Sequence, residues 1–184
     1  MPEWVLGQNI IRAIKENFNS QRNCLEDFQI DNPLQATSPK MKKEDQRSNV
    51  KWKAPLRGWI KGNFDGVSKG NPGKASYGGV LRDHNGNIID AIAIPIGIST
   101  SHKAEATVAL YTMRLAMDTS NWYLWMEGDS LNIINMLNGK SLITWSIEAS
   151  VMEIKTLMDK FEKVIFSHSY CEGNVVADWI AKGF

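Results

Sequence analysis

The sequence predicts one α/β domain in which helices pack on a mixed five-stranded sheet. Segments with the pattern of strands come first as a meander and then alternate with helical segments, in the order βββαβααβα. The length of 184 residues fits one domain with an appendage, and 43% hydrophobic and 22% charged residues are typical of a globular chain. The longest uncharged stretch, residues 91–102, contains Pro95 and several hydroxyl side chains, so we expect no membrane span.

The first 50 residues differ in composition from the rest of the chain. Apolar residues recur near helical spacing between Ile10 and Phe18, which predicts a short amphipathic helix. Residues 31–50 contain prolines, small polar residues and mixed charges, which is the composition of a linker. We therefore place an N-terminal helix and a polar, basic linker in residues 1–50 and the folded domain in residues 51–184.

Three strands are predicted at the start of the domain. Strand-like segments cover residues 58–67, 77–83 and 88–96. Clusters of Gly, Asn, Asp and Pro at residues 69–73 and 83–86 predict the turns between them. Turns this short favour an antiparallel meander.

Helices and strands alternate in the remainder. Apolar residues recur at helical spacing over residues 102–118, which predicts a long helix with Thr100 or Ser101 as its N-cap. The other predicted elements are a strand over residues 122–127, helices over 131–137 and 147–161, a strand over 164–168 and a final helix that opens at Asn174.

Four acidic residues fall where such a sheet can bring them together. Asp65 lies in the first strand and Asp129 ends the fourth, so the two meet if these strands are central neighbours. Glu105 and Asp178, expected in the first turns of the first and last helices, can lie above them. Clustered carboxylates repel one another and need cations, and hard oxygen ligands select magnesium or manganese. Two such ions can hold a phosphodiester for in-line attack by water.

Each of these acids also has a purely structural interpretation. Asp129 can cap the helix that follows it, and Glu105 can complement a helix dipole. Asp178 can be a surface residue, and Asp65 can belong to a turn. Spacing alone leaves both interpretations open.

The charge is nearly balanced overall but unevenly distributed. The net charge is +1, yet residues 40–61 hold eight basic and two acidic side chains. This basic segment is either a phosphate-binding surface or a solvated linker. Cys24 and Cys171 are far apart, as expected for free thiols in a reducing, intracellular compartment, and both nucleus and cytoplasm stay open. Glu3 stands where a secretory leader would carry positive charge.

Six short motifs follow one another from Trp52 onward. They are Trp-Lys-Ala-Pro at 52–55 with Gly-Trp-Ile-Lys at 58–61, Asn-Phe-Asp-Gly at 63–66, Gly-Gly-Val-Leu-Arg-Asp at 78–83, Thr-Ser-His-Lys-Ala-Glu-Ala at 100–106, Glu-Gly-Asp-Ser at 127–130, and His168 with Asn-Val-Val-Ala-Asp at 174–178. In these motifs and their order the chain resembles the ribonuclease H family of type 1, and more closely the retroelement-related ribonuclease-H-like domains of plants. The resemblance implies the ribonuclease-H-like fold.

The resemblance also implies an activity and its catalytic residues. The reaction is hydrolysis of the RNA strand of an RNA/DNA hybrid with two magnesium ions, for which manganese can substitute. Asp65, Glu105, Asp129 and Asp178 match the family's catalytic, metal-binding carboxylates, with Asp65 bridging the two ions. His168 matches the family's histidine that assists proton transfer or product departure.

Further positions match the family's substrate contacts. Gly66 and Glu105 correspond to groups that sense ribose 2′-hydroxyls. Asn71 and Thr100 match contacts to the nucleic-acid backbone, although a turn asparagine and a helix cap explain them equally well. Asn174 is also expected at the substrate. The implied partner is the hybrid, bound by a monomer that does not associate with membranes.

The chain departs from the family in two places. The loop at residues 169–173 lacks the glycine-rich form of the cellular enzymes, and its Cys171 stands where plant copies usually have a basic residue. Residues 138–146 are too short for the basic helical protrusion of some members. Two functions therefore stay open: a magnesium-dependent hybrid ribonuclease, and a catalytically retired retroelement-derived domain that binds nucleic acid or a protein. A resolvase or transposase core is disfavoured by the Gly-Asn-Pro-Gly turn at 70–73.

Overall fold

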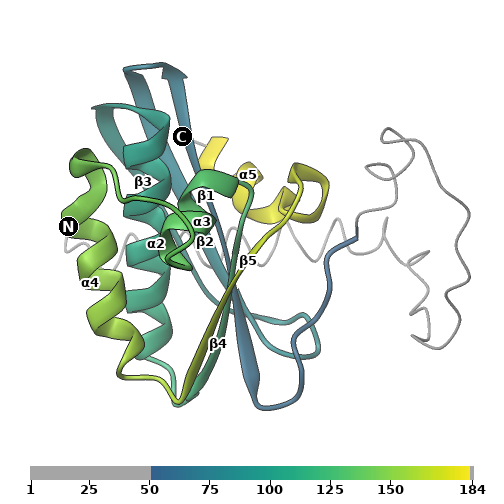
Figure 1. The fold of residues 1–184 in the computed structure, drawn as a ribbon. Coiled ribbons are helices and arrows are strands. Elements are labelled where there is room, and N and C mark those ends of the chain that lie inside the picture. The colour runs from purple at the N-terminus through teal and green to yellow at the C-terminus, as the bar shows by residue number, and fades with distance from the viewer. Residues whose placement is uncertain (1–50, 183–184) are drawn as a thin grey trace, which may run out of the picture.

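A computed structural model describes residues 51–182, in which five strands form one mixed sheet in the order β3-β2-β1-β4-β5 (Figure 1). The central strand β1 pairs antiparallel with β2 and parallel with β4, while β2–β3 is antiparallel and β4–β5 parallel. This confirms the predicted fold class. The strands are β1 (Trp59–Gly70), β2 (Gly73–Arg82), β3 (Ile88–Ser99), β4 (Tyr123–Gly128) and β5 (Lys163–His168).

Helices cover both faces of this sheet. The long helix α2 lies against β1 and β2 with α4 packed on it, and α5 lies on the opposite face of the same two strands (Figure 1). The helices are α2 (Ser101–Met117), α3 (Leu131–Leu137), α4 (Glu148–Met158) and α5 (Val175–Lys182), with short 3₁₀ helices at Trp145–Ile147 and Cys171–Gly173. Among the described residues no helix is long and apolar enough to cross a bilayer.

The alternation of side chains along β2 separates two cores. Leu81 joins the larger core beneath α2, α3 and α4, where Phe64 and Met113 are also fully buried. Its neighbour Val80 points to the other face and packs with Ile180 of α5. Successive strand residues face opposite sides, so a single strand supplies both cores.

The observed elements depart from the predicted bounds mainly at the first hairpin. The β1–β2 register continues to the pair Gly70 and Gly73, so only Asn71 and Pro72 form the turn. Backbone pairing therefore extends both strands beyond the residues at which the sequence pattern predicted them to end. The predicted helix and linker of residues 1–50 lie outside the described residues, as do residues 183–184.

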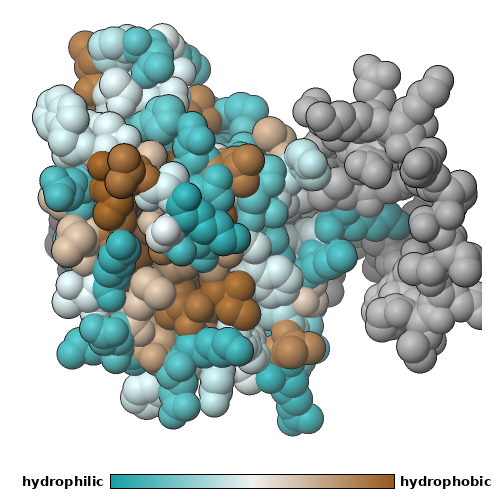
Figure 2. All heavy atoms as spheres, in the orientation of Figure 1, coloured by the Kyte–Doolittle hydropathy of each residue, from teal (hydrophilic) through white to brown (hydrophobic). Residues whose placement is uncertain are grey.

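The segment between α3 and α4 carries two large, exposed apolar side chains. Leu142 and Trp145 are 93% and 85% exposed, and Lys140 is the one basic residue in this segment. In the space-filling view of Figure 2, hydrophobic side chains gather in patches among hydrophilic ones. The short segment between α3 and α4 accordingly offers little positive charge to a nucleic acid.

Candidate active site

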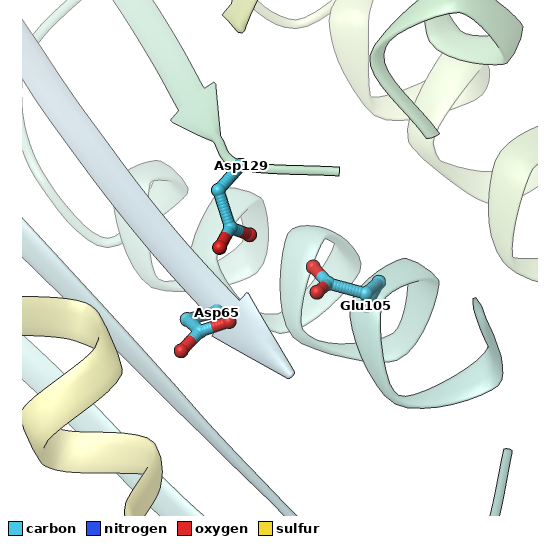
Figure 3. Close-up of side chains that lie close together, drawn as sticks. All are labelled: Asp65, Glu105 and Asp129. Carbon is cyan, nitrogen blue, oxygen red and sulfur yellow. The ribbon is translucent and has the colours of Figure 1, made fainter. Parts of the chain in front are cut away.

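Three of the four predicted acids converge at one end of the sheet. Asp65 lies on β1, Asp129 directly follows β4, and Glu105 projects from α2 (Figure 3). One carboxylate oxygen from each lies within 4.8 Å of the others. Residues from three separate elements thus form a compact acidic cluster.

The strand pairing brings the two aspartates together. The parallel register of β1 and β4 ends at the pair Phe64 and Gly128, so Asp65 and Asp129 are the next residues on neighbouring strands. Asp65 therefore belongs to a strand and not to a turn. The N-cap of α3 is Ser130, so Asp129 does not cap that helix.

A glycine allows the helix that carries Glu105 to reach the cluster. A Cβ atom on Gly66 would lie 2.5 Å from the backbone nitrogen of Glu105, closer than real contacts allow. The Gly66 N–H also donates a hydrogen bond to the Glu105 carboxylate. Glu105 lies in the second turn of α2, not in the first as predicted, because the helix begins at Ser101. It is therefore placed to face the sheet, not to complement the helix dipole.

The three carboxyl groups of the cluster are largely buried, and this disfavours their ionised forms. Burial, followed by the charge of Asp129, raises the pKa of Asp65 to about 7. Burial, followed by the charges of Asp65 and Asp129, raises the pKa of Glu105 well above its usual range. The buried Oε2 of Glu105 has no hydrogen-bond partner. An unpartnered carboxylate oxygen beside two further carboxylates is a donor set that fits a hard divalent cation such as Mg²⁺.

The fourth predicted acid, Asp178, lies beside the cluster and outside the group of three. It is in the first turn of α5, and a hydrogen bond joins its carboxyl group to that of Asp65. Its Oδ1 also lies 2.6 Å from the Nζ of Lys182, one turn further along the helix. The structure thus places Asp178 against Asp65 at the edge of the cluster, where it also pairs with a lysine of its own helix.

His168 and Cys171 lie next to Asp129. The Nε2 of His168 at the end of β5 is 3.0 Å from the backbone oxygen of Asp129, and the ring meets Tyr170 edge-on. The Cys171 thiol donates to Asp129 Oδ2 at 3.2 Å. At residue 171 a thiol, and not a basic side chain, therefore contacts the cluster.

The predicted substrate contacts occupy different environments. Thr100 caps α2 by accepting a hydrogen bond from the Lys103 N–H at 3.3 Å, and Asn71 accepts one from the Ser101 N–H at 3.3 Å. Both side chains lie on the exposed rim where the first hairpin meets α2. Asn174 is instead only 1% exposed, and its amide bonds inside the protein, which corrects its expected place at the substrate.

A buried polar row next to the cluster was not predicted. Asn63, Arg82 and Glu127 are each less than 10% exposed and lie on neighbouring strands. Lys61, counted above in the basic segment, is 1% exposed and pairs with Glu127 at 2.8 Å, so it cannot bind phosphate. The sequence does contain a pattern that indicates this row. Polar residues occur at every second position, at 61, 63 and 65 and again at 127 and 129, so they lie on one face of each strand.

The sequence of this chain is similar to those of known proteins. The model of the reverse transcriptase-like family matches residues 63–183. A predicted ribonuclease H protein of Arabidopsis thaliana is 33% identical over 132 residues, which are 72% of this chain and 21% of that protein. Ribonuclease HI of Halobacterium salinarum is 33% identical over 82 residues, 45% of this chain and 41% of the enzyme. The chain thus spans about a fifth and two fifths of these relatives.

Solved structures agree with the sequence matches. Ribonuclease H1 of Halobacterium salinarum superposes with a TM-score of 0.64 at 27% identity, covering 67% of this chain and 94% of that one. LC11 ribonuclease H1, solved in complex with an RNA/DNA hybrid, has a TM-score of 0.62 at 22% identity with the same coverage. The family match covers more than half of the chain, so the chain belongs to the reverse transcriptase-like family, and it has a ribonuclease-H-like fold.

Proposed function

We propose that this chain hydrolyses the RNA strand of RNA/DNA hybrids with Mg²⁺ held by Asp65, Glu105 and Asp129. The observation that carries the proposal is the cluster of three carboxylates, whose ligand atoms lie within 4.8 Å of one another. Two relatives are named as ribonucleases H, and one structural neighbour was solved with a hybrid. Mg²⁺, or Mn²⁺ in its place, would supply a Lewis acid that activates water and stabilises charge on the phosphate.

The carboxyl groups of the cluster are poorly solvated, and this determines how they bind a cation. Because the pKa of Asp65 is about 7, the metal-free site holds protons near neutral pH, and cation binding must release them. Glu105 contributes an oxygen that has no competing partner within the protein. In this proposal Asp178, joined to Asp65 by a hydrogen bond, completes the site after it exchanges Lys182 for the cation.

His168 is the proposed proton carrier. When its Nε2–H donates to the Asp129 backbone oxygen, its Nδ1 is left as an acceptor. A half-buried imidazole beside a cluster ligand can take a proton there during the reaction and return it to the leaving oxygen.

The rim of the site supplies the proposed selectivity. The backbone of Gly66 and the carboxylate of Glu105 lie together where β1 meets α2, and both offer acceptors to a ribose 2′-hydroxyl. Asn71 and Thr100 lie at the start of α2, where the positive end of the helix dipole favours phosphate. RNA would thus be read by its 2′-hydroxyls, and the hybrid would be held by its backbone.

The test compares four substrates of one sequence: hybrid, duplex DNA, duplex RNA and single-stranded RNA, each with either Mg²⁺ or a chelator. We expect cleavage of the RNA strand of the hybrid alone, and only with Mg²⁺. Equal cutting of duplex DNA, or hybrid left intact at every Mg²⁺ concentration, would refute the proposal.

Two observations favour the second function, a retired domain that binds without cutting. Lys182 forms an ion pair with Asp178, and the Cys171 thiol donates a hydrogen bond to Asp129. Such a domain would bind the hybrid in a gel-shift assay yet leave it uncut at every Mg²⁺ and Mn²⁺ concentration.

A further inference from the structure

Asn63 is the centre of a buried hydrogen-bonded hub, which we define as Asn63, Glu127 and Asn174. The Asn63 Nδ2 donates to Glu127 Oε2 at 3.1 Å and to Asn174 Oδ1 at 3.2 Å. Its Oδ1 accepts from Arg82 Nη2 at 2.7 Å and from Trp52 Nε1 at 2.8 Å. A side-chain amide has two N–H donors and two acceptor lone pairs, so every bonding position of this 0% exposed residue is used.

The hub joins the three segments that carry aspartates of the site. Asn63 precedes Asp65 by two residues on β1, and Glu127 precedes Asp129 by two residues on β4. Asn174 lies one helical turn before Asp178, whose backbone N–H donates to the Asn174 carbonyl at 3.1 Å. These offsets are short and lie within or beside regular elements, so a shift of the hub moves the aspartates with it.

Asn174 bonds to the backbone as well as to the hub. Its Nδ2 donates to the carbonyl oxygen of Phe64 at 2.9 Å. Phe64 is the residue directly before Asp65, so the start of α5 is fixed to the strand at the point where the cluster begins. Asn174 therefore determines how close α5 lies to β1.

The charged side chains at the hub have contacts outside the acidic cluster. Glu127 pairs with Lys61 at 2.8 Å, and the Lys61 ammonium lies 3.8 Å from the centre of the Trp125 ring. Arg82 lies 3.8 Å from the centre of the Trp52 ring. The buried charges thus have their own partners, and Asn63 is the neutral connector between them.

We propose that Asn63 and Asn174 are positioning residues that hold Asp65, Asp129 and Asp178 at the separation needed to bind a divalent cation. This inference rests on the proposed function, because it assumes that the cluster binds the ion. Groups that orient metal ligands commonly change metal affinity or activity by about 10- to 100-fold when they are removed.

The experiment measures Mn²⁺ binding to the full chain by calorimetry and by electron paramagnetic resonance. The variants are Asn63→Leu, Asn174→Ala and the double variant. The matched control is Val151→Ala, which opens a cavity at the buried face of α4, a helix that packs on α2 and carries no residue of the hub. Melting temperatures report stability separately, and kcat and KM on the hybrid are measured at saturating Mn²⁺.

We expect each single variant to lose Mn²⁺ affinity about tenfold or more. We expect kcat to fall while KM for the hybrid is unchanged, and the double variant to lose no more than the larger single loss, because the residues act as a unit. Val151→Ala should keep wild-type affinity at a lowered melting temperature. If Asn63→Leu does not fold, Asn174→Ala carries the test, since it leaves Glu127–Lys61 and Asn63–Arg82 intact.

A folded Asn63→Leu or Asn174→Ala that binds Mn²⁺ within twofold of wild type would overturn the inference. So would an equal loss of affinity in Val151→Ala, which would show that general stability sets the affinity. A wild-type chain that binds no Mn²⁺ would instead overturn the proposed function, and this inference with it.

Discussion

Asp65 is the residue on which the proposed chemistry depends most. It is 4% exposed, it faces Asp129, and its carboxyl group bonds to that of Asp178. In the metal-free protein its ionisation is therefore opposed by both burial and like charge. Under the proposed function, Asp65 is expected to be the ligand shared by the bound cations.

Asp65→Asn should remove most of the activity while preserving the fold. The loss of a metal ligand should lower turnover by more than about 100-fold. In chelator at pH 8 the variant should be more stable by about 1 kcal/mol, because one repelling charge is gone. Cleavage assays and urea unfolding measure both effects. Asp159→Asn, at the exposed C-cap of α4, is the control, and near-normal turnover in Asp65→Asn would contradict the proposed cluster.

The raised pKa of Asp65 predicts how stability depends on pH. Between its usual value of 3.8 and about 7, the unfolded state releases the proton while the folded state keeps it. The folded metal-free protein then binds more protons, so this contribution to stability is lost as pH rises from about 4 to about 7. In chelator, the melting temperature of Asp65→Asn minus that of wild type should increase over this range. A constant difference would show that the Asp65 pKa is not raised.

At the scale of elements, the close contact of β1 with α2 sets the shape of the site. Gly66→Ala would place a methyl group 2.5 Å from the Glu105 nitrogen, and the atoms in its way are backbone. We expect a cost of about 1–3 kcal/mol from overpacking, together with weaker Mn²⁺ binding because Glu105 is displaced. Thermal unfolding and calorimetry check this prediction.

Gly97→Ala provides the control for that substitution. Gly97 has a φ of +74° with nothing within 4 Å of its added Cβ, so alanine there costs stability through backbone strain alone. It should leave Mn²⁺ affinity unchanged. If both variants weaken Mn²⁺ binding equally, the contact at Gly66 is not specific to the site.

The strands and helices could be predicted from the sequence wherever the local pattern of apolar and turn residues determines them. Alternation and turn residues predicted all five strands, and the parallel pairing of β1 with β4 brought Asp65 to Asp129 as expected. The bonding of Asn174 to Asn63 and to the Phe64 carbonyl depends on how α5 packs on the sheet, which local spacing does not encode. The pairing of Asp178 with Lys182 is by contrast an i, i+4 contact within α5, which the helical spacing of these two residues already allows.

At the scale of the whole molecule, positive charge is densest in the basic segment of residues 40–61, which runs into the start of the domain. Within the domain, Lys61 is buried in the polar row, whereas Lys51, Lys53 and Arg57 are exposed. The segment between α3 and α4 adds little charge. Hybrid affinity is thus expected to depend on basic residues near the start of the domain.

Replacing Lys40, Lys42, Lys43 and Arg47 by Gln tests this expectation. Each lost phosphate contact should lower the slope of log affinity against log salt by about 0.9. Hybrid binding should weaken and its salt dependence should flatten, while turnover at saturating hybrid is unchanged. A matched control replaces four basic residues of the domain, Lys140, Lys155, Lys160 and Lys163. An unchanged salt slope in the first variant would show the segment to be a solvated linker.

The measurement that tests the central claim most directly is the location of Mn²⁺ by anomalous diffraction from crystals of the full chain. The account predicts an anomalous peak within bonding distance of carboxylate oxygens of Asp65 and of Glu105 or Asp129, and its disappearance in Asp65→Asn. Peaks found only elsewhere on the molecule, or a peak at the cluster that survives Asp65→Asn unchanged, would contradict it.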